Sequence, residues 1–152
     1  MEVVLINPQI PQNTGSIARS CAATNTPLNL VGKKGFEIDE KKVRRAGLDY
    51  WPYVNLKEYS DFDTYLSEKK EQKIWLISKF GTVNYFDADF KTDDILVFGS
   101  ETKGLGDEFM GKYDKKQILK IPMNSPNVRS LNLSNAVSIV LYEALKKINH
   151  FS

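Results

Sequence analysis

The first 31 residues contain the stretch that decides the fold, VVLINPQIPQNTGSIARSCAATNTPLNLV at 3–31. Two short apolar runs within it, VVLI at 3–6 and LNLV at 28–31, have the length and composition of buried strands. Between the two runs, Thr14 is a good N-cap for a helix over 15–24. A strand, a helix and a second strand predict the beginning of a mostly parallel α/β sheet.

The same alternation of strands and helices continues along the chain. Further apolar runs predict buried strands at 74–78, 95–99 and 118–122. Helices are expected over 40–46 after Asp39, from Asp61 to about 69, shortly after Gly104, and over 133–148. This order indicates an α/β fold with a mostly parallel sheet and helices on both faces. We see no repeat or linker and expect one domain over 1–152.

The composition narrows the chemistry. The 152 residues are 41% hydrophobic and 26% charged, and no apolar run approaches the roughly 20 residues that cross a membrane. Met1 is followed by EVVLI rather than by a signal peptide, so we expect a cytoplasmic protein. One cysteine, Cys21, and one histidine, His150, argue against disulfides, metal sites and Ser-His-Asp catalysis. The net charge of +2 permits an anionic partner.

The loop NPQIPQNTGSIARS at 7–20 is rich in hydrogen-bonding side chains, among them Asn13. Parallel sheets bind ligands beyond the carboxyl ends of their strands, so this position favours a binding loop. Arg19 lies about 200° around the helix from the inward-facing Ile17 and suits a phosphate or a ribose. The alternative is an ordinary strand-to-helix turn with a surface arginine.

A second stretch, ILVFGSETKGLG at 95–106, is similar to a phosphate-binding loop but lacks its chemistry. A P-loop needs Lys and then Ser or Thr after its last glycine, whereas Leu and Gly follow Gly104. What remains is a buried strand that ends at Gly99, where a ligand can approach bare backbone, and then Glu101 in a tight turn. Taken alone, this pattern is common in α/β proteins.

A third stretch, SPNVRSLNLSNAVSIVLYEALKK at 125–147, joins a polar segment to a helix with one continuous apolar stripe. The polar segment offers more capping side chains than one helix start needs, including Ser130, Asn132 and Asn135. The excess predicts a ligand near the unpaired backbone N–H groups of the helix start. Elaborate capping is the alternative.

The same helix carries Ile139 and Tyr142 on a second flank, away from the main apolar stripe. A solvated helix face does not need two large apolar side chains. Two explanations remain open: the helix is buried widely within its own domain, or this flank contacts a second subunit.

The segment DEKKVRRAGLDYWPY at 39–53 places cations beside aromatic rings. The cations are Lys41, Lys42, Arg44 and Arg45, and the rings are Tyr50, Trp51 and Tyr53. Cations suit phosphates and rings stack on unpaired bases, which favours an RNA interface. A basic helix face beside a hydrophobic cluster is the alternative.

In this order and spacing, NPQIPQNTGSIARSCAATN, LVFGSETKGL and IPMNSPNVRSLNLSNAVSIVLYEAL resemble the three motifs of the SpoU-like branch of the SPOUT RNA methyltransferases. The resemblance covers nearly the whole chain. With RRAGLDYW between the motifs and no appended RNA-binding domain, the chain is most similar to the minimal tRNA wobble-nucleotide 2′-O-methyltransferases. The resemblance implies a C-terminal trefoil knot, S-adenosyl-L-methionine as cofactor, tRNA as substrate, a homodimer and no metal.

The resemblance also implies roles for individual residues. The implied cofactor-binding residues are Ile77, Gly99, Ile121, Ser130, Leu131 and Asn135. The implied catalytic residues are Arg19, Asn13, Glu101, Ser130 and Asn132. The implied RNA-binding residues are Arg19, Lys41, Lys42, Arg44, Arg45 and Arg129, and the implied subunit contact is made by Ile139 and Tyr142.

The expected reaction transfers a methyl group to the ribose 2′-hydroxyl of cytidine or uridine 34. Cys21 has the sequence context of a core residue, and methylation of a ribose oxygen needs no cysteine nucleophile. Arg19 either accepts the hydroxyl proton or only aligns the hydroxyl, since a guanidinium with a pKa above about 12 is a poor base. The alternatives are a 2′-O-methyltransferase that acts on ribosomal RNA and a non-catalytic RNA-binding protein with the same fold.

Overall fold

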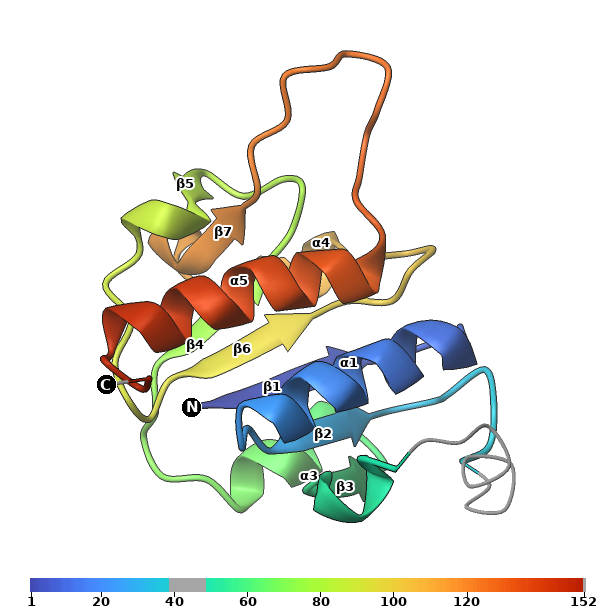
Figure 1. Cartoon of the computed structure of the whole chain (residues 1–152). Coiled ribbons are helices and arrows are strands. Elements are labelled where there is room, and N and C mark those ends of the chain that lie inside the picture. The colour runs from blue at the N-terminus through green and yellow to red at the C-terminus, as the bar shows by residue number, and fades with distance from the viewer. Residues whose placement is uncertain (39–48, 152) are drawn as a thin grey trace.

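The computed structural model describes residues 1–38 and 49–151, which form a seven-stranded sheet covered by helices (Figure 1). The strands are β1 (Glu2–Ile6), β2 (Leu28–Val31), β3 (Leu56–Tyr59), β4 (Ile74–Ile77), β5 (Val83–Asn84), β6 (Ile95–Phe98) and β7 (Ile118–Lys120). Their order across the sheet is β3-β2-β1-β6-β4-β7-β5, and all neighbours are parallel. The predicted α/β class is therefore confirmed.

Helices cover both faces of this sheet (Figure 1). The helices α1 (Pro11–Ala23) and α5 (Leu133–Lys147) pack side by side on one face, where the Ser20 and Ser138 hydroxyl oxygens lie 3.0 Å apart. The shorter helices α3 (Phe62–Ser67) and α4 (Asp107–Met110) pack on the other face. Three 3-10 helices complete the described elements: η1 (Trp51–Tyr53), η2 (Tyr85–Asp87) and η3 (Lys115–Gln117).

The central strands are apolar on both sides because each side has its own core. In β1, Val3 and Leu5 pack with Leu141 of α5, whereas Val4 faces the other way and packs with Tyr65 of α3. Successive side chains of a strand point to opposite faces, so a strand between two helical layers reads as a continuous apolar run. Because they are buried on both faces, these strands could be predicted from their apolar runs in the sequence.

The predicted strands all exist, with small differences at their ends. The runs at 74–78, 95–99 and 118–122 stop one or two residues early, at Ile77, Phe98 and Lys120. The strands β3 and β5 were not predicted, because LKEY is polar and lies at a sheet edge, and β5 has only two residues. The predicted helix over 40–46 and its cap Asp39 lie outside the described residues.

The predicted start of the first helix was wrong. The helix α1 begins at Pro11 with Ile10 as N-cap, and Thr14 is a buried residue inside it rather than its cap. Proline fits the first helical position, since its fixed φ is helical and it lacks an N–H that would be unpaired there. By contrast, the prediction for Asp61 is confirmed, because its carboxylate accepts a 2.7 Å hydrogen bond from the Thr64 N–H at the start of α3.

The segment between β7 and α5 runs out from the sheet as a long loop and returns to the start of α5 (Figure 1). Residues 124–132 of this loop are all exposed. The trefoil knot implied by the family resemblance stays a prediction. None of the helices in the described part of the chain has the length and apolar character needed to span a bilayer.

Candidate functional site

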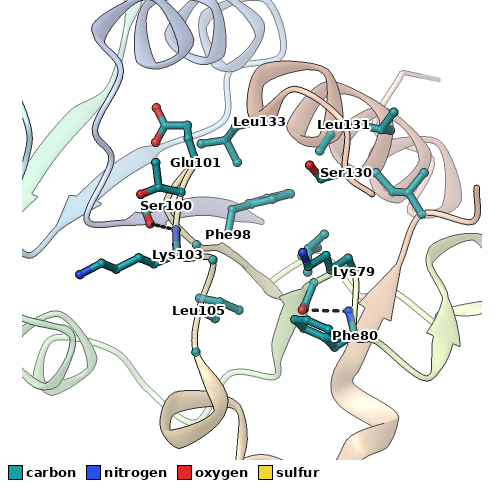
Figure 2. A pocket seen from close by; sticks show the side chains of 18 of the residues that line it. Lys79, Phe80, Phe98, Ser100, Glu101, Lys103, Leu105, Ser130, Leu131 and Leu133 are labelled. Carbon is teal, nitrogen blue, oxygen red and sulfur yellow. Dashed lines mark hydrogen bonds between the residues drawn. The ribbon is translucent and has the colours of Figure 1, made fainter. Parts of the chain in front are cut away.

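A cleft of about 700 Å³ lies beyond the carboxyl ends of β4, β6 and β7, and Figure 2 shows the side chains gathered around it. Its walls are formed by residues 77–80, 98–107 and 130–133, together with Ile121 and Met123 of the long loop. Sites for small organic ligands commonly have volumes of roughly 300–1,000 Å³. The cleft therefore has the size and the position at the sheet edge expected of a ligand site.

The structure brings most of the predicted cofactor residues to this cleft. Five of the six residues that were predicted to bind the cofactor line the cleft: Ile77, Gly99, Ile121, Ser130 and Leu131. Asn135 does not line it, and its backbone N–H instead donates a 3.3 Å hydrogen bond to the Asn132 side chain. Asn135 thus belongs to the first turn of α5 rather than to the cleft wall.

Gly99 is required by the tight turn that follows β6. The backbones of Ser100 and Gly104 hydrogen-bond to each other in both directions, and Gly104 has a φ of +60°. A Cβ atom on Gly99 would lie 2.1 Å from the carbonyl carbon of Gly104, far inside contact distance. The turn therefore exposes bare backbone to the cleft at Gly99, as the sequence predicted.

Glu101 ties this turn to the loop that follows β1. Its two carboxylate oxygens accept hydrogen bonds from the Gln9 N–H at 3.0 Å, the Ile10 N–H at 2.6 Å and the Asn13 amide at 3.2 Å. Partial burial acts to raise the pKa of Glu101, but these hydrogen bonds outweigh it and lower the pKa below its usual value. Glu101 is therefore ionised at neutral pH and occupied by donors, which suits an anchor better than a proton acceptor.

Asn13 and Asn132 extend this connection to α5. The Asn132 amide donates a 3.0 Å hydrogen bond to the Asn13 side-chain oxygen. The Asn132 side-chain oxygen accepts from the Ser134 N–H at 2.9 Å and caps the helix. A chain of hydrogen bonds from Glu101 through Asn13 to Asn132 thus joins the three stretches that the sequence singled out.

Arg19 lies apart from this network. It is exposed on α1, outside the cleft of its own chain, and the guanidinium carbon lies 5.5 Å from the centre of the Tyr50 ring. Arg19 is six positions after Asn13, which is about 9 Å along a helix axis. Within one chain, the structure therefore does not bring Arg19 together with Glu101, Asn13 and Asn132.

The predicted RNA-binding residues are only partly within the structure. Lys41, Lys42, Arg44 and Arg45 lie outside the described residues. Arg129 is exposed on the long loop between β7 and α5. Of the three rings proposed to stack on bases, Tyr50 and Trp51 pack against the core and only Tyr53 is free, with 76% of its surface exposed.

The second flank of α5 is not buried within the chain. Ile139 and Tyr142 are 36% and 44% exposed, and the Tyr142 ring stacks on Phe151 at 5.5 Å between ring centres. Wide burial of the helix within its own chain is therefore not the reason for these apolar side chains. Contact with a second subunit stays a prediction.

Several residues that line the cleft were missed in the sequence. They are Ser78, Lys79, Phe80, Phe98, Leu105, Met123 and Leu133. The loop after β4 was detectable in principle, because it follows the carboxyl end of a predicted buried strand. The apolar residues could not be told from core residues by periodicity alone.

Two observations limit the chemistry of the described residues. Burial raises the pKa of the Cys21 thiol to about 12, so this side chain is an inert core residue rather than a nucleophile. Across residues 1–38 and 49–151, no group of three or more His, Cys, Asp or Glu side chains is placed to hold a metal ion.

Comparison with known proteins places this chain in a family. A model of the SpoU rRNA Methylase family matches residues 1–142. The tRNA (cytidine(34)-2′-O)-methyltransferase of Saccharophagus degradans is 40% identical over 146 residues, covering 96% of this chain and 94% of that protein.

Two solved structures have the same fold. One, described as "Structural insights into the 2-OH methylation of C/U34 on tRNA", is 40% identical with a TM-score of 0.88, covering 96% of this chain and 94% of that one. The SpoU methyltransferase AviRb from Streptomyces viridochromogenes, in complex with the cofactor AdoMet, is 26% identical with a TM-score of 0.75 and covers 97% of this chain and 57% of that one. On the strength of the family match and of these relatives, the chain belongs to the SpoU rRNA Methylase family.

Proposed function

We propose that this protein transfers a methyl group from S-adenosyl-L-methionine to the ribose 2′-hydroxyl of nucleotide 34 of tRNA, a cytidine or a uridine. The observation that carries the proposal is the cleft in which the three family motifs meet, joined by the hydrogen bonds of Glu101, Asn13 and Asn132. The relatives named for tRNA cytidine 34 support the choice of substrate. A cytoplasmic location goes with such a substrate and is part of the proposal.

The walls of the cleft fit an adenosine-containing cofactor. Gly99 offers backbone that no Cβ covers, and Ile77, Phe98, Leu105 and Leu133 supply apolar surface for a purine ring and a thioether. The structure of the SpoU methyltransferase AviRb has been solved with bound AdoMet, which is S-adenosyl-L-methionine, and this supports the same cofactor here. When bound, the sulfonium of S-adenosyl-L-methionine supplies an activated methyl group, and no metal is required.

The contribution of the protein is to align the 2′-hydroxyl with that methyl group. Orientation of two bound reactants can lower a barrier by roughly 7–11 kcal/mol. Ser130 and Asn132 lie at the cleft, and Asn132 is held in place by its bonds to Asn13 and to the first turn of α5. An arginine guanidinium is a poor base, so we assign Arg19 the alignment of the hydroxyl and a neighbouring phosphate rather than proton removal.

The site would be completed by a second copy of the chain. Arg19 lies outside the cleft of its own chain, and the Ile139 and Tyr142 flank of α5 is exposed. Both observations are explained if two chains pack through this region and each Arg19 reaches the partner's cleft. A homodimer is therefore part of the proposed function.

Incubation of the protein with labelled S-adenosyl-L-methionine and unmodified tRNA tests the activity. We expect label at the 2′-oxygen of nucleotide 34, found by mapping the modified residue. A non-catalytic RNA-binding protein would leave tRNA unlabelled, and label in ribosomal RNA alone would favour the other 2′-O-methyltransferase activity. Mapping the lost modification in cells without the protein gives the same answer in vivo.

The variant Arg19→Ala tests the assignment of roles. We expect it to lose methyl transfer while its affinity for S-adenosylhomocysteine, measured by calorimetry, stays close to that of the wild type. The reason is that the cleft forms without Arg19 within each chain, and that Arg19 is assigned to the hydroxyl and phosphate of the RNA rather than to the cofactor. Unchanged turnover in this variant would refute the role of Arg19.

A further inference from the structure

Tyr50 lies along one turn of α1 and contacts it at two points. The Tyr50 hydroxyl donates a 3.1 Å hydrogen bond to the backbone carbonyl of Gly15. The guanidinium carbon of Arg19 lies 5.5 Å from the centre of the same ring, within the range of a cation–π interaction. Gly15 and Arg19 are four residues apart and therefore on the same side of the helix, so a single tyrosine spans the turn between them.

The position of Tyr50 is itself fixed by its surroundings. Its carbonyl accepts a 2.9 Å hydrogen bond from the Tyr53 N–H in η1, and both Tyr50 and Trp51 pack against the core. Burial raises the pKa of the Tyr50 phenol, the charge of Arg19 acts to lower it, and Asp49 raises it again, with a net rise. The phenol therefore keeps its proton at neutral pH and remains a donor to Gly15.

Arg19 has few constraints apart from this ring. Its side chain is exposed, and among the described residues Tyr50 is its only side-chain partner. A long exposed arginine samples many rotamers, and each must be given up when the side chain binds a substrate. A ring that already holds the guanidinium reduces that loss.

We propose that Tyr50 is a positioning residue that holds Arg19 in the orientation required for methyl transfer. The proposal rests on the role assigned to Arg19 under the proposed function. Tyr50 does not touch the cleft and is not a catalytic residue. Its hydroxyl fixes the ring on α1 at Gly15, and its ring face holds the guanidinium.

Two variants separate the ring from the hydroxyl. Tyr50→Leu removes the ring, and we expect kcat to fall roughly tenfold, the upper part of the range for a cation–π contact. Tyr50→Phe keeps the ring, and we expect it to retain most of the activity. In both variants, the affinity for S-adenosylhomocysteine and the KM for S-adenosyl-L-methionine should stay within about twofold of the wild type, because Tyr50 does not line the cleft.

A double-mutant cycle with Arg19→Ala distinguishes positioning from a purely structural role, and it is measured in the affinity for tRNA because Arg19→Ala leaves no methyl transfer to compare. If Tyr50 acts through Arg19, Tyr50→Leu weakens tRNA binding in the wild type and costs no further affinity once Arg19 is absent. If Tyr50 only stabilises the fold, the same fractional loss of affinity appears in both backgrounds, and the proposal is wrong. Thermal unfolding of all four proteins accounts for losses caused by unfolding.

A measurement without substrate keeps the proposal testable if the wild type transfers no methyl group to tRNA. The Nε–Hε signal of Arg19 in an NMR spectrum of labelled protein reports the ring above it. We expect this signal to move toward the position of a free arginine in Tyr50→Leu and to stay near its native position in Tyr50→Phe. An unmoved signal in Tyr50→Leu would overturn the contact itself, whereas a shifted signal without activity would count only against the proposed function.

Discussion

The tight turn that follows β6 and lines the cleft can form because Gly99 has no Cβ. A Cβ on Gly99 would lie 2.1 Å from the carbonyl carbon of Gly104. That carbon is a backbone atom and the Cβ is fixed to the backbone, so neither atom can move aside by a change of rotamer. A large residue elsewhere in the cleft can change its rotamer, but this contact can be relieved only by moving the main chain. Of the glycines that line the cleft, Gly99, Gly104 and Gly106, only Gly99 is a position where an added Cβ would clash.

We predict that Gly99→Ala lowers the free energy of unfolding by about 1–3 kcal/mol, as overpacking does elsewhere. It should also weaken binding of S-adenosylhomocysteine by about tenfold or more, because the displaced turn lines the cleft. Thermal or urea unfolding and calorimetry measure the two effects.

Gly15→Ala is the matched control for this substitution. A Cβ at Gly15 meets nothing within 4 Å, and the residue lies inside α1. Alanine should stabilise the helix by roughly 0.5–1 kcal/mol relative to glycine. If Gly99→Ala were as harmless as Gly15→Ala, the close approach at the turn would be disproved.

At the scale of elements, the start of α5 has two tasks that rest on one side chain. The Asn132 oxygen caps the helix through the N–H groups of Ser134 and Asn135, and the Asn132 amide donates to Asn13. A helix end needs only the first of these bonds. The second bond links α5 to the first turn of α1, where Asn13 lines the cleft.

We predict that two substitutions of Asn132 separate these tasks. Asn132→Ala should lower the free energy of unfolding by about 0.5–2 kcal/mol through loss of the cap. Asn132→Asp keeps the accepting oxygen, and a carboxylate is favourable at a helix start, so its stability should stay close to that of the wild type.

Both variants should lose methyl transfer, since neither can donate to Asn13. Full activity in Asn132→Asp would show that the bond to Asn13 is dispensable. Equal loss of stability in both variants would instead contradict the division between capping and bridging.

Strands and helices can be predicted from the sequence where burial produces an apolar pattern, and they are missed or misplaced where it does not. The strands β1, β2, β4 and β6 were predicted because helices cover both of their faces. The strand β3 was missed because Lys57 and Glu58 face solvent at a sheet edge. The start of α1 was placed too late because Thr14 is a good cap by type, whereas Pro11 and its backbone geometry decided the position.

At the scale of the whole molecule, the resemblance to a family located the cleft better than local pattern could. Glu101 lies far from Ser130 and Asn132 in the sequence, and only the fold brings the loops after β6 and β7 together. Hydrogen bonds such as that between Asn132 and Asn13, 119 residues apart, leave no periodic signal. Likewise, no property of residues 7–20 indicates that Arg19 lies outside the cleft of its own chain.

That separation leads to the prediction for the assembled molecule. We expect Tyr142→Asp to convert a dimer into a monomer in light scattering, because it places a charge in an apolar contact. The monomer should still bind S-adenosylhomocysteine, since the cleft of each chain is intact, but it should not transfer methyl groups. Tyr53→Asp is the control, because Tyr53 is even more exposed but lies on η1, away from the flank of α5.

Mixed dimers test whether the two chains share a site. Arg19→Ala chains have an intact cleft, and Asn132→Asp chains have an intact Arg19, so each is inactive alone in the shared arrangement. Mixing them should restore activity, because some dimers then combine the cleft of one chain with Arg19 of the other. If the site were complete within one chain, mixing would restore nothing, since neither chain carries both. A dimeric Tyr142→Asp protein would move the subunit contact away from the Ile139 and Tyr142 flank, and complementation would still decide whether Arg19 acts across it.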